Sequence, residues 1–310
     1  MPRPLTHSTE NTPRFVPADH SQIHTPAQPL VSVIIPSFNR AWCLKKTVDS
    51  VLAQDYPNFE IIAVDDGSTD GTDDLLKAYG SAVTVIHQEN RGVSAARNRG
   101  VAAASGALIA FLDSDDYWYP QKLSAQVNFF LANPEALICQ TEEIWIRDGK
   151  RANPKEKHRK RSGMIFEPSL ALCLISPSAV MMRKSFFMKM NGFDESLPAC
   201  EDYDLWLRVT CRYPVHLIPA PLIVKTGGHD DQLSSATGLD KFRIHALQKI
   251  LGSGLLTKTQ YQAAQDMLKT KCRIYADGCM KHGHRTVAAY YHRLAEEIED
   301  KPPYPEESTD

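Results

Sequence analysis

Short apolar segments alternate with segments of helical periodicity through residues 31–131, and this alternation limits the folds open to the chain. The apolar segments, rich in β-branched and aromatic residues, are residues 31–35, 59–64, 83–87 and 107–112. Helical spacing is found over residues 42–54, 92–104 and 119–131. This order predicts an α/β fold with a Rossmann-like, mostly parallel central sheet and flanking helices. Sheets of this kind bind ligands at the carboxyl ends of their strands.

The flanking segments differ in composition from the alternating region. Residues 1–29 hold six prolines among polar residues, a pattern typical of disorder. Two short strands are predicted near residues 215–218 and 222–225, and helical periodicity returns from residue 238 to about residue 298. We therefore expect a disordered leader (1–29), a main domain (30–235) with a first half (30–132) and a second half (133–235), a helical C-terminal extension (236–300) and a flexible tail (301–310).

Composition excludes several classes of protein. The chain has 35 basic against 37 acidic side chains, so its formal charge is −2 and we expect no nucleic-acid partner. The seven cysteines form no C-x-x-C pair, which predicts reduced thiols and a cytoplasmic protein. The N-terminus lacks the apolar segment of a secretory signal, and the longest apolar stretch, residues 101–112, is too short to span a bilayer.

The strongest chemical signal is the acidic sequence Asp113-Ser-Asp-Asp116, which directly follows the apolar segment 107–112. Three carboxylates within four residues repel one another unless a cation lies among them. Asp113 and Asp115 are two residues apart and could face the same side of an extended chain. They could then hold Mg²⁺ or Mn²⁺ together with phosphate oxygens. An acidic turn that caps the following helix explains the pattern equally well.

Two further acidic pairs stand at predicted element boundaries. Asp65-Asp66 ends the second apolar segment, where a carboxylate can accept hydrogen bonds from a nucleobase or a ribose. A glycine-rich turn with Asp capping is an equal alternative. Glu201-Asp202 opens a predicted helix that runs to about residue 213, and acids are common at helix starts for electrostatic reasons alone. All three acidic groups together favour a functional site.

A basic segment, residues 150–161, surrounds Pro154 with few apolar side chains and predicts an exposed loop. A solvated loop is the simpler interpretation. Contact with anionic lipid, or with a phosphate of an acceptor, is the functional alternative.

Four motifs resemble those of family 2 glycosyltransferases in order and spacing. They are Val31-Ser-Val-Ile-Ile-Pro-Ser-Phe-Asn-Arg40, Val64-Asp-Asp-Gly-Ser-Thr-Asp-Gly-Thr72, Gly92-Val-Ser-Ala-Ala-Arg-Asn-Arg-Gly100 and Phe111-Leu-Asp-Ser-Asp-Asp116, extended by Gly192-Phe-Asp-Glu195 and Glu201-Asp-Tyr-Asp-Leu-Trp206. The resemblance spans roughly residues 30–235. It implies a GT-A fold, an inverting transfer from a nucleotide-diphosphate sugar, with a UDP-sugar as the expected donor, and a bound Mn²⁺ or Mg²⁺. It further implies a sugar or lipid-linked sugar acceptor and a part in the synthesis of cell-surface polysaccharide or glycoconjugate.

The same resemblance implies roles for single residues. At the nucleotide it implies Pro36 and Phe38 against the base, Asn39 beside them, Asp65 and Asp66 at the base edge, and Arg97 near the ribose or diphosphate. Asp113 and Asp115 match the D-x-D pair, with Asp115 as the direct metal ligand. His229 follows a glycine pair where relatives contact metal or diphosphate. Asp202 matches the general base that deprotonates the acceptor.

Two other classes of function compete with this one. A non-catalytic module that binds sugar nucleotides has no chemical need to keep both Asp115 and Asp202. A sugar nucleotidyltransferase would carry a glycine-rich loop with arginine after the first strand, where this chain has Pro-Ser-Phe-Asn-Arg. Processive synthases carry a Q-x-x-R-W motif and membrane helices, which are not found here. We therefore expect a single-addition enzyme, held at most peripherally at the inner face of the membrane.

Overall fold

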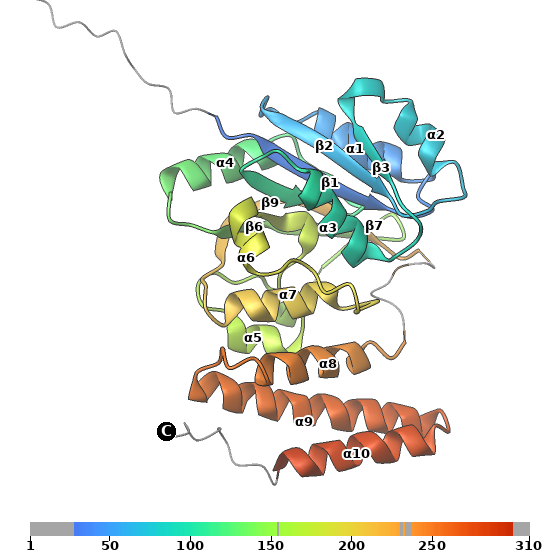
Figure 1. Ribbon diagram of the computed structural model, residues 1–310, viewed down its shortest axis with the longest axis vertical. Coiled ribbons are helices and arrows are strands. Elements are labelled where there is room, and N and C mark those ends of the chain that lie inside the picture. The colour runs from blue at the N-terminus through green and yellow to red at the C-terminus, as the bar shows by residue number, and fades with distance from the viewer. Residues whose placement is uncertain (1–27, 154, 230–231, 233–236, 300–310) are drawn as a thin grey trace, which may run out of the picture.

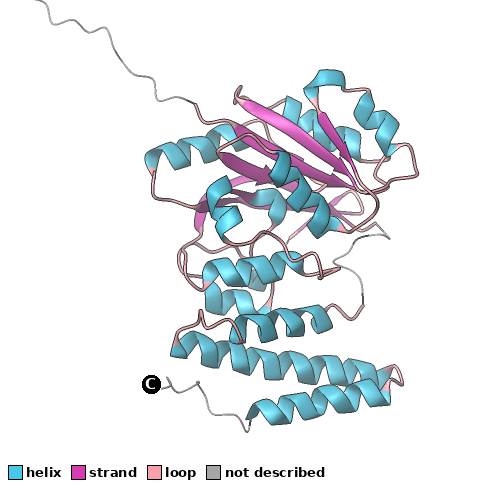
Figure 2. Ribbon diagram, viewed as in Figure 1, coloured by secondary structure: helices cyan, strands magenta, loops and turns pink. Residues whose placement is uncertain are grey.

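One mixed β-sheet forms the centre of the molecule, and helices cover both of its faces (Figure 1 and Figure 2). The computed structural model describes residues 28–153, 155–229, 232 and 237–299, so the predicted tail and nearly all of the predicted leader lie outside it. Within these residues the sheet has nine strands, in the order β3-β2-β1-β4-β8-β6-β9-β5, with β7 paired to β6. The strands are β1 (Val31–Ser37), β2 (Phe59–Asp65), β3 (Thr84–His87), β4 (Leu108–Phe111), β5 (Tyr117–Trp118), β6 (Ile138–Arg147), β7 (Lys150–Ala152), β8 (Val180–Arg183) and β9 (His216–Gly227).

The first half of the sheet is parallel, as the alternation predicts. Strand β1 lies between β2 and β4, and β3 pairs with the other side of β2. Val33 and Ile35 of β1 pack into one apolar core, whereas Ile34 packs into the core on the opposite face. This two-sided burial explains why β1 is a continuous apolar run, since neither face meets water. The α/β class is confirmed, and the carboxyl ends of β1, β2 and β4 meet at one edge of the sheet.

The second half of the sheet is of mixed direction and joins the first half without a break. Strand β8 is antiparallel to both β4 and β6, and β9 is parallel to β6. Short β5 pairs antiparallel with β9. The strands of the two predicted halves, 30–132 and 133–235, therefore belong to one sheet.

Two layers of helices sandwich this sheet, and a further stack continues below it in Figure 1. One face packs against α1 (Leu44–Leu52), α2 (Thr72–Lys77) and α4 (Lys122–Ala132), and the other against α3 (Val93–Ala103), α6 (Lys184–Lys189) and α7 (Glu201–Thr210). Beyond α7 lie α5 (Phe166–Ala171), α8 (Asp240–Leu251), α9 (Lys258–Lys281) and α10 (Arg285–Glu299), which share a third apolar core with it. A capping box between Thr257 and Gln260 begins α9. None of the helices in the described part of the chain is long and apolar enough to cross a membrane.

The structure differs from the predicted elements at three places. Pro36 does not end β1 but lies within it, beyond Ile34, the last residue of β1 that pairs with β4. Two short strands predicted near residues 215–225 are one long strand, β9. Strands β6 and β8, which complete the sheet, were not expected from the sequence. In β6 the apolar residues are interrupted by polar ones such as the buried Gln140, and β8 has only three apolar residues before Arg183.

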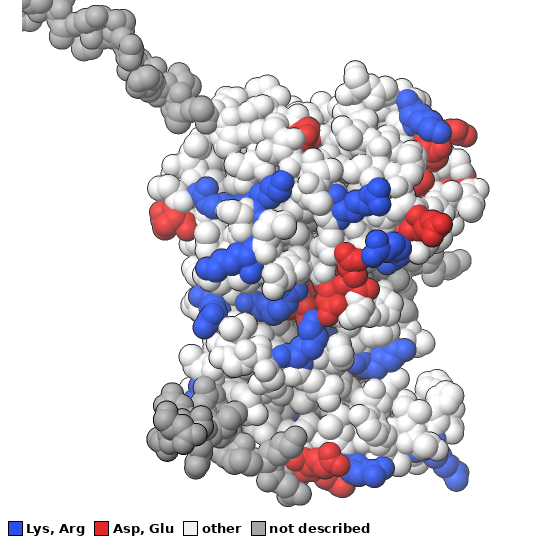
Figure 3. All heavy atoms as spheres, viewed as in Figure 1, with Lys and Arg blue, Asp and Glu red and all other residues white. Residues whose placement is uncertain are grey.

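Charges of both signs lie side by side across the middle of the face in Figure 3, over α6 and α7. Among the described residues Arg91 contacts Glu195 at 2.9 Å, and Arg208 contacts the buried Asp204 at 2.9 Å. This face therefore carries no continuous basic surface.

Candidate active site

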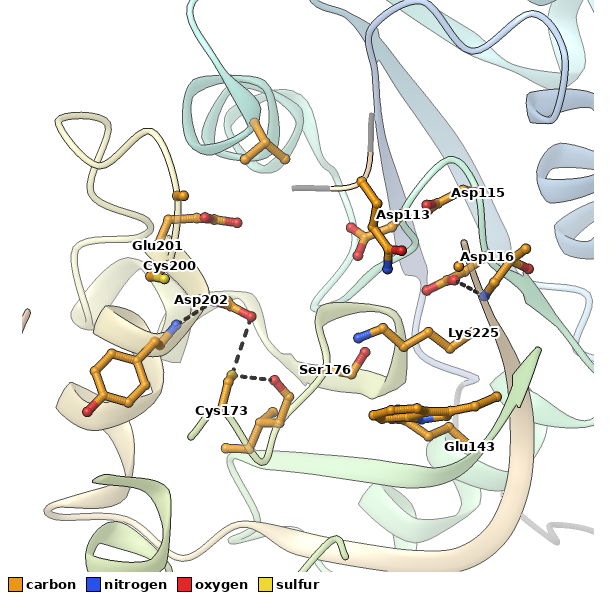
Figure 4. A pocket seen from close by; sticks show the side chains of 18 of the residues that line it. Asp113, Asp115, Asp116, Glu143, Cys173, Ser176, Cys200, Glu201, Asp202 and Lys225 are labelled. Atoms are coloured by element: carbon orange, nitrogen blue, oxygen red, sulfur yellow. Dashed lines mark hydrogen bonds between the residues drawn. The ribbon is translucent and has the colours of Figure 1, made fainter. Parts of the chain in front are cut away.

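A cavity of about 420 Å³ opens at the carboxyl edge of the parallel strands (Figure 4). Its walls come from segments far apart in the sequence: the loop after β4, the start of α7, strands β6 and β9, and the loop before β8. Of the residues proposed from the sequence, the cavity brings together Pro36, Arg97, Asp113, Asp115, Asp202 and His229. Phe38, Asn39, Asp65 and Asp66 are not among its lining residues.

The carboxylates of the acidic loop after β4 differ in role: Asp116 is bound within the fold, whereas Asp113 and Asp115 line the cavity. Asp116 is buried, and its oxygens accept hydrogen bonds from the Ser178 hydroxyl at 2.6 Å and the Thr226 amide at 2.8 Å. It therefore joins β4 to β8 and β9. Burial, together with the charge of Asp113, raises the pKa of Asp115 despite the opposing contact with His229. Such crowded carboxylates are the electrostatic condition that a bound cation relieves.

Asp115 and His229 are the best-placed pair of metal-ligand atoms in this cavity. Asp115 Oδ2 lies 2.7 Å from His229 Nε2. The described residues contain no protein-only cage around them, because the one group of three ligand atoms within 4.8 Å of each other is Asp65, Asp73 and His87 at the ends of β2 and β3. Mg²⁺ and Mn²⁺ commonly use one or two carboxylates and take other ligands from substrate phosphates. The oxygen and imidazole donors at Asp115 and His229 fit that use.

Arg97 lies deep in α3 and contacts acids from both sides of the cavity. Its guanidinium donates to Asp113 Oδ1 at 2.7 Å and to Glu201 Oε1 at 2.6 Å, and stands 5.0 Å from the Phe193 ring centroid. Burial alone would lower the pKa of Arg97, but the two carboxylates outweigh it and the pKa is raised. The role near the ribose or diphosphate that the resemblance implies remains a prediction. The contacts in this structure are with the two acidic motifs.

Asp202 is positioned by the first turn of α7 and by the loop before β8. Cys200, at the N-cap of α7, has a left-handed backbone with φ of 61° and turns the chain into the helix. Asp202 Oδ1 accepts the Tyr203 amide at 2.7 Å, and Oδ2 lies 3.3 Å from the Cys173 thiol (Figure 4). Among the described residues no cation pairs with Asp202, whereas neighbouring Glu201 is paired with Arg97. A carboxylate has about four acceptor positions, so Asp202 keeps capacity for a further hydrogen bond.

The loops after β1 and β2 bind each other beside the cavity. The backbone N–H of Asn39 donates to the Ser68 hydroxyl at 2.8 Å, and the side-chain Oδ1 of Asn39 accepts the backbone N–H of Thr69 at 2.8 Å. Asp66 accepts hydrogen bonds from the backbone amides of residues 91 and 92, which fixes the start of α3. Phe38 is 43% exposed. Exposure leaves its ring accessible to a base, and the nucleotide roles of these residues remain predictions.

The sequence analysis did not single out several residues of the cavity wall. They include Glu143 and Trp145 of β6, Cys173 and Ser176 of the loop before β8, and Lys225 of β9. No local pattern marks them. Strand β6 was not expected, the predicted strand near residues 222–225 carried no functional signal, and their meeting depends on the pairing of β6 with β9.

The basic segment 150–161 is not exposed throughout. Six of its basic side chains are exposed: Lys150, Arg151, Lys155, Lys157, Arg159 and Arg161. Lys160 is buried instead, with Nζ 2.9 Å from Glu143 Oε2 and 3.1 Å from Gln140 Oε1. Two residues of the predicted loop, His158 and Lys160, therefore belong to the wall of the cavity.

Comparison with known proteins identifies the family of the chain. The family model described as glycosyl transferase family 2 matches residues 32–190. An uncharacterised glycosyltransferase of Rickettsia typhi is 34% identical over 242 residues, which cover 76% of this chain and 74% of that protein. The chain belongs to glycosyl transferase family 2. It is accordingly a transferase of sugars.

Other relatives of this glycosyltransferase are named for a role in polysaccharide or glycoconjugate synthesis. The UDP-Glc:alpha-D-GlcNAc-diphosphoundecaprenol beta-1,3-glucosyltransferase WfgD of Escherichia coli is 32% identical over 185 residues, 58% of this chain and 69% of WfgD. The putative teichuronic acid biosynthesis glycosyltransferase TuaG of Bacillus subtilis is 43% identical over 126 residues, 39% of this chain and 50% of TuaG. Some relatives are much longer: the match with a glycosyltransferase of Rickettsia felis covers 35% of that protein.

Solved structures of glycosyltransferases share the fold. S. aureus TarS in complex with UDP-GlcNAc has a TM-score of 0.66 at 17% identity, over 87% of this chain and 91% of that chain. The mannosyltransferase PcManGT of Pyrobaculum calidifontis, in complex with GDP-Man and Mn²⁺, has a TM-score of 0.55 at 19% identity, over 90% of this chain and 83% of that chain. The GT-A fold is thereby confirmed.

Proposed function

We propose that this glycosyltransferase moves a sugar from a UDP-sugar to a hydroxyl of a lipid-linked sugar acceptor, with inversion at the anomeric carbon and Asp202 as the base. The activity for which WfgD is named uses a UDP-sugar and a lipid-linked sugar, which supports this choice of substrates. One observation carries the assignment of the base. Of the two acids at the start of α7, Glu201 is committed to Arg97 and Asp202 has no ion pair among the described residues.

In the proposed mechanism the chain orients the acceptor and receives its proton. The acceptor hydroxyl donates to Asp202, which takes the proton as the oxygen attacks the anomeric carbon from the face opposite the diphosphate. Single displacement from that face inverts the configuration. Positioned proton transfer of this kind contributes about 10²–10⁴-fold to rate. Mn²⁺ or Mg²⁺ held by Asp115 and His229, with Asp113 beside them, would neutralise charge on the departing diphosphate.

The variant Asp202→Asn tests the base, because it keeps the shape of the side chain and removes the basic oxygen. We expect kcat to fall by about 10²–10⁴-fold, while the Kd for UDP with Mn²⁺ and the melting temperature stay close to native values. Asp266→Asn, a change of the same kind at an exposed site on α9, serves as the control. Transfer from a panel of UDP-Glc, UDP-GlcNAc and GDP-Man would be followed by nucleotide release, with the product anomer assigned by NMR. Native-rate transfer by Asp202→Asn would exclude it as the base.

We further propose that the exposed part of the segment 150–161 contacts anionic lipid at the inner face of the cytoplasmic membrane, where a lipid-linked acceptor would be met. Its exposed basic side chains far outnumber its acids, with Glu156 opposed to Arg159 at 3.4 Å. Each basic residue near an anionic surface contributes about 1 kcal/mol.

Vesicle sedimentation tests this contact. Lys155→Gln with Lys157→Gln should weaken binding to vesicles that contain phosphatidylglycerol and reduce its salt dependence, because exposed charges are screened over roughly 8–10 Å. Lys258→Gln with Lys281→Gln on α9 removes the same charge elsewhere and should have a smaller effect. The segment is only a solvated loop if the native protein does not sediment with these vesicles.

A further inference from the structure

Lys225 enters the cavity as a cation that has no hydrogen-bond or ion-pair partner among the described residues. It is half-buried on β9, directly opposite Trp145 of β6 in the strand register, with Nζ 5.9 Å from the centroid of the Trp145 indole. Figure 4 shows its amino group pointing into the cavity, between Asp113 on one side and Asp202 on the other. No hydrogen bond or ion pair joins Nζ to any residue that the structure describes.

Two of the acids around Lys225 are paired with other cations. Glu143 contacts Lys160 at 2.9 Å and accepts the Trp145 indole N–H at 2.6 Å. Asp113 contacts Arg97 at 2.7 Å. Although burial works against the ammonium, the charges of Glu143, Asp116, Asp113 and Asp202 raise its pKa, so Lys225 is charged at neutral pH. Its three N–H donors face the cavity without a hydrogen-bond acceptor among the described residues.

Ser176 supplies a second unsatisfied group on the same wall. It is only 7% exposed, and its hydroxyl has no hydrogen-bond partner among the described residues. Buried hydroxyls without a partner are rare, because each costs the free energy of its lost hydration. Figure 4 places the Ser176 side chain beneath the end of Lys225, so the two donors converge on one part of the cavity.

We propose that Lys225 and Ser176 form a binding site for a phosphate group of a substrate. An ammonium group with a neighbouring hydroxyl matches phosphate oxygens in charge and in hydrogen bonding. A neutral sugar hydroxyl would accept from these donors but would bring no negative charge to the ammonium, so it would bind more weakly than a phosphate oxygen. The inference rests on the proposed function, which brings two diphosphates to this cavity: that of the donor, on the side of Asp113, and that of a lipid-linked acceptor, on the side of Asp202.

Equilibrium binding tests the site without requiring transfer. The probes are UDP with Mn²⁺ for the donor, and a short-chain alkyl diphosphate of N-acetylglucosamine for the acceptor, each compared with its phosphate-free counterpart, uridine and an alkyl N-acetylglucosaminide. For Lys225→Met we expect one diphosphate to bind about 10- to 100-fold more weakly, as for a lost charge-assisted hydrogen bond. Ser176→Ala should weaken the same ligand by about 2- to 10-fold. Binding of the phosphate-free probes should not change.

Two control variants separate a phosphate contact from a general loss of charge. Lys225→Arg keeps the cation and should retain most of the affinity. Lys160→Met removes a positive charge from the same cavity, but one already paired with Glu143, so we expect a smaller loss of affinity together with a lower melting temperature. The diphosphate that loses affinity in Lys225→Met identifies the source of the phosphate.

The proposed site would be overturned if both diphosphates bound Lys225→Met within about twofold of the native protein, or if the native protein bound neither. Failure of the proposed function would look different. In that case the native protein would bind a diphosphate through Lys225 and yet transfer sugar from no donor.

Discussion

Replacing Arg97 by methionine should destabilise the protein strongly, because its guanidinium is the shared partner of two acids. Its side chain is 4% exposed, and those of Glu201 and Asp113 are 8% and 27% exposed. Removing one partner of a buried ion pair costs about 3–5 kcal/mol, since the remaining charge is left in a poorly solvated place. Most of this cost falls on Glu201, because Asp113 is still partly hydrated.

The loss in free energy of unfolding can be measured by urea and thermal unfolding of the Arg97→Met variant. For a chain of this size a loss of 1 kcal/mol lowers the melting temperature by about 2–4 °C, so we expect a decrease of about 6–20 °C. Combining Arg97→Met with Glu201→Gln should recover part of the loss, because a neutral amide no longer leaves a buried charge. Asp113→Asn should recover less.

The double variant Arg97→Met with Glu201→Gln measures the coupling energy between the two side chains. If the effects of Arg97→Met and Glu201→Gln simply add, the two side chains are not coupled and the ion pair contributes nothing measurable. A coupling energy of at least about 1 kcal/mol is expected from their 2.6 Å contact.

Two further predictions concern the fold. Burial lowers the pKa of Lys122 to about 7, so at pH 7 the unfolded chain binds the proton of this lysine more tightly than the folded protein does. Lys122→Met removes this cost and should raise the free energy of unfolding at pH 7 by about 2–4 kcal/mol, although the variant loses the hydrogen bond to Gln126. This gain should disappear as the pH approaches 10, where the unfolded chain also loses the proton; equal stability of both proteins at pH 7 and pH 10 would refute it. Gly100→Ala should cost about 1–3 kcal/mol in urea unfolding, because the added Cβ would stand 2.5 Å from Cγ2 of Ile34, and an unchanged midpoint would show that α3 can move away from β1.

The parts of the site that lie at the ends of β1, β2 and β4 could be predicted because their signals are local. A continuous apolar run marks a strand buried on both faces, and the acidic residues follow it directly in the sequence, as Asp113 follows β4. The placement of Asp202 near Asp113 could only be inferred by resemblance, since nothing in either segment specifies the other. In the structure Arg97 makes that connection through contacts on both sides.

The remaining wall could not be predicted because it depends on pairing between distant strands. Strand β6 has four consecutive polar residues, 140–143, between its apolar residues, and half of the strand is only partly buried. Its partner β9 contains two prolines and shows register shifts against β6 near Glu142. Sequence alone does not show that Trp145 will stand opposite Lys225, and the properties of Lys225 follow from that meeting.

The pattern of ion pairs in the cavity indicates which charged groups are available to substrates. Each structural charge has a partner from another segment: Arg97 for Glu201, Lys160 for Glu143, and hydrogen-bond donors of β9 and the loop before β8 for Asp116. These contacts hold the wall of the cavity in place and leave Glu201, Glu143 and Asp116 already bound to partners. Asp202 has no ion pair in the described residues and lies across the cavity from Lys225 in Figure 4. A hydroxyl bound at Asp202 and a phosphate bound at Lys225 would satisfy both side chains. The two groups would belong to one bound molecule or to two molecules in contact.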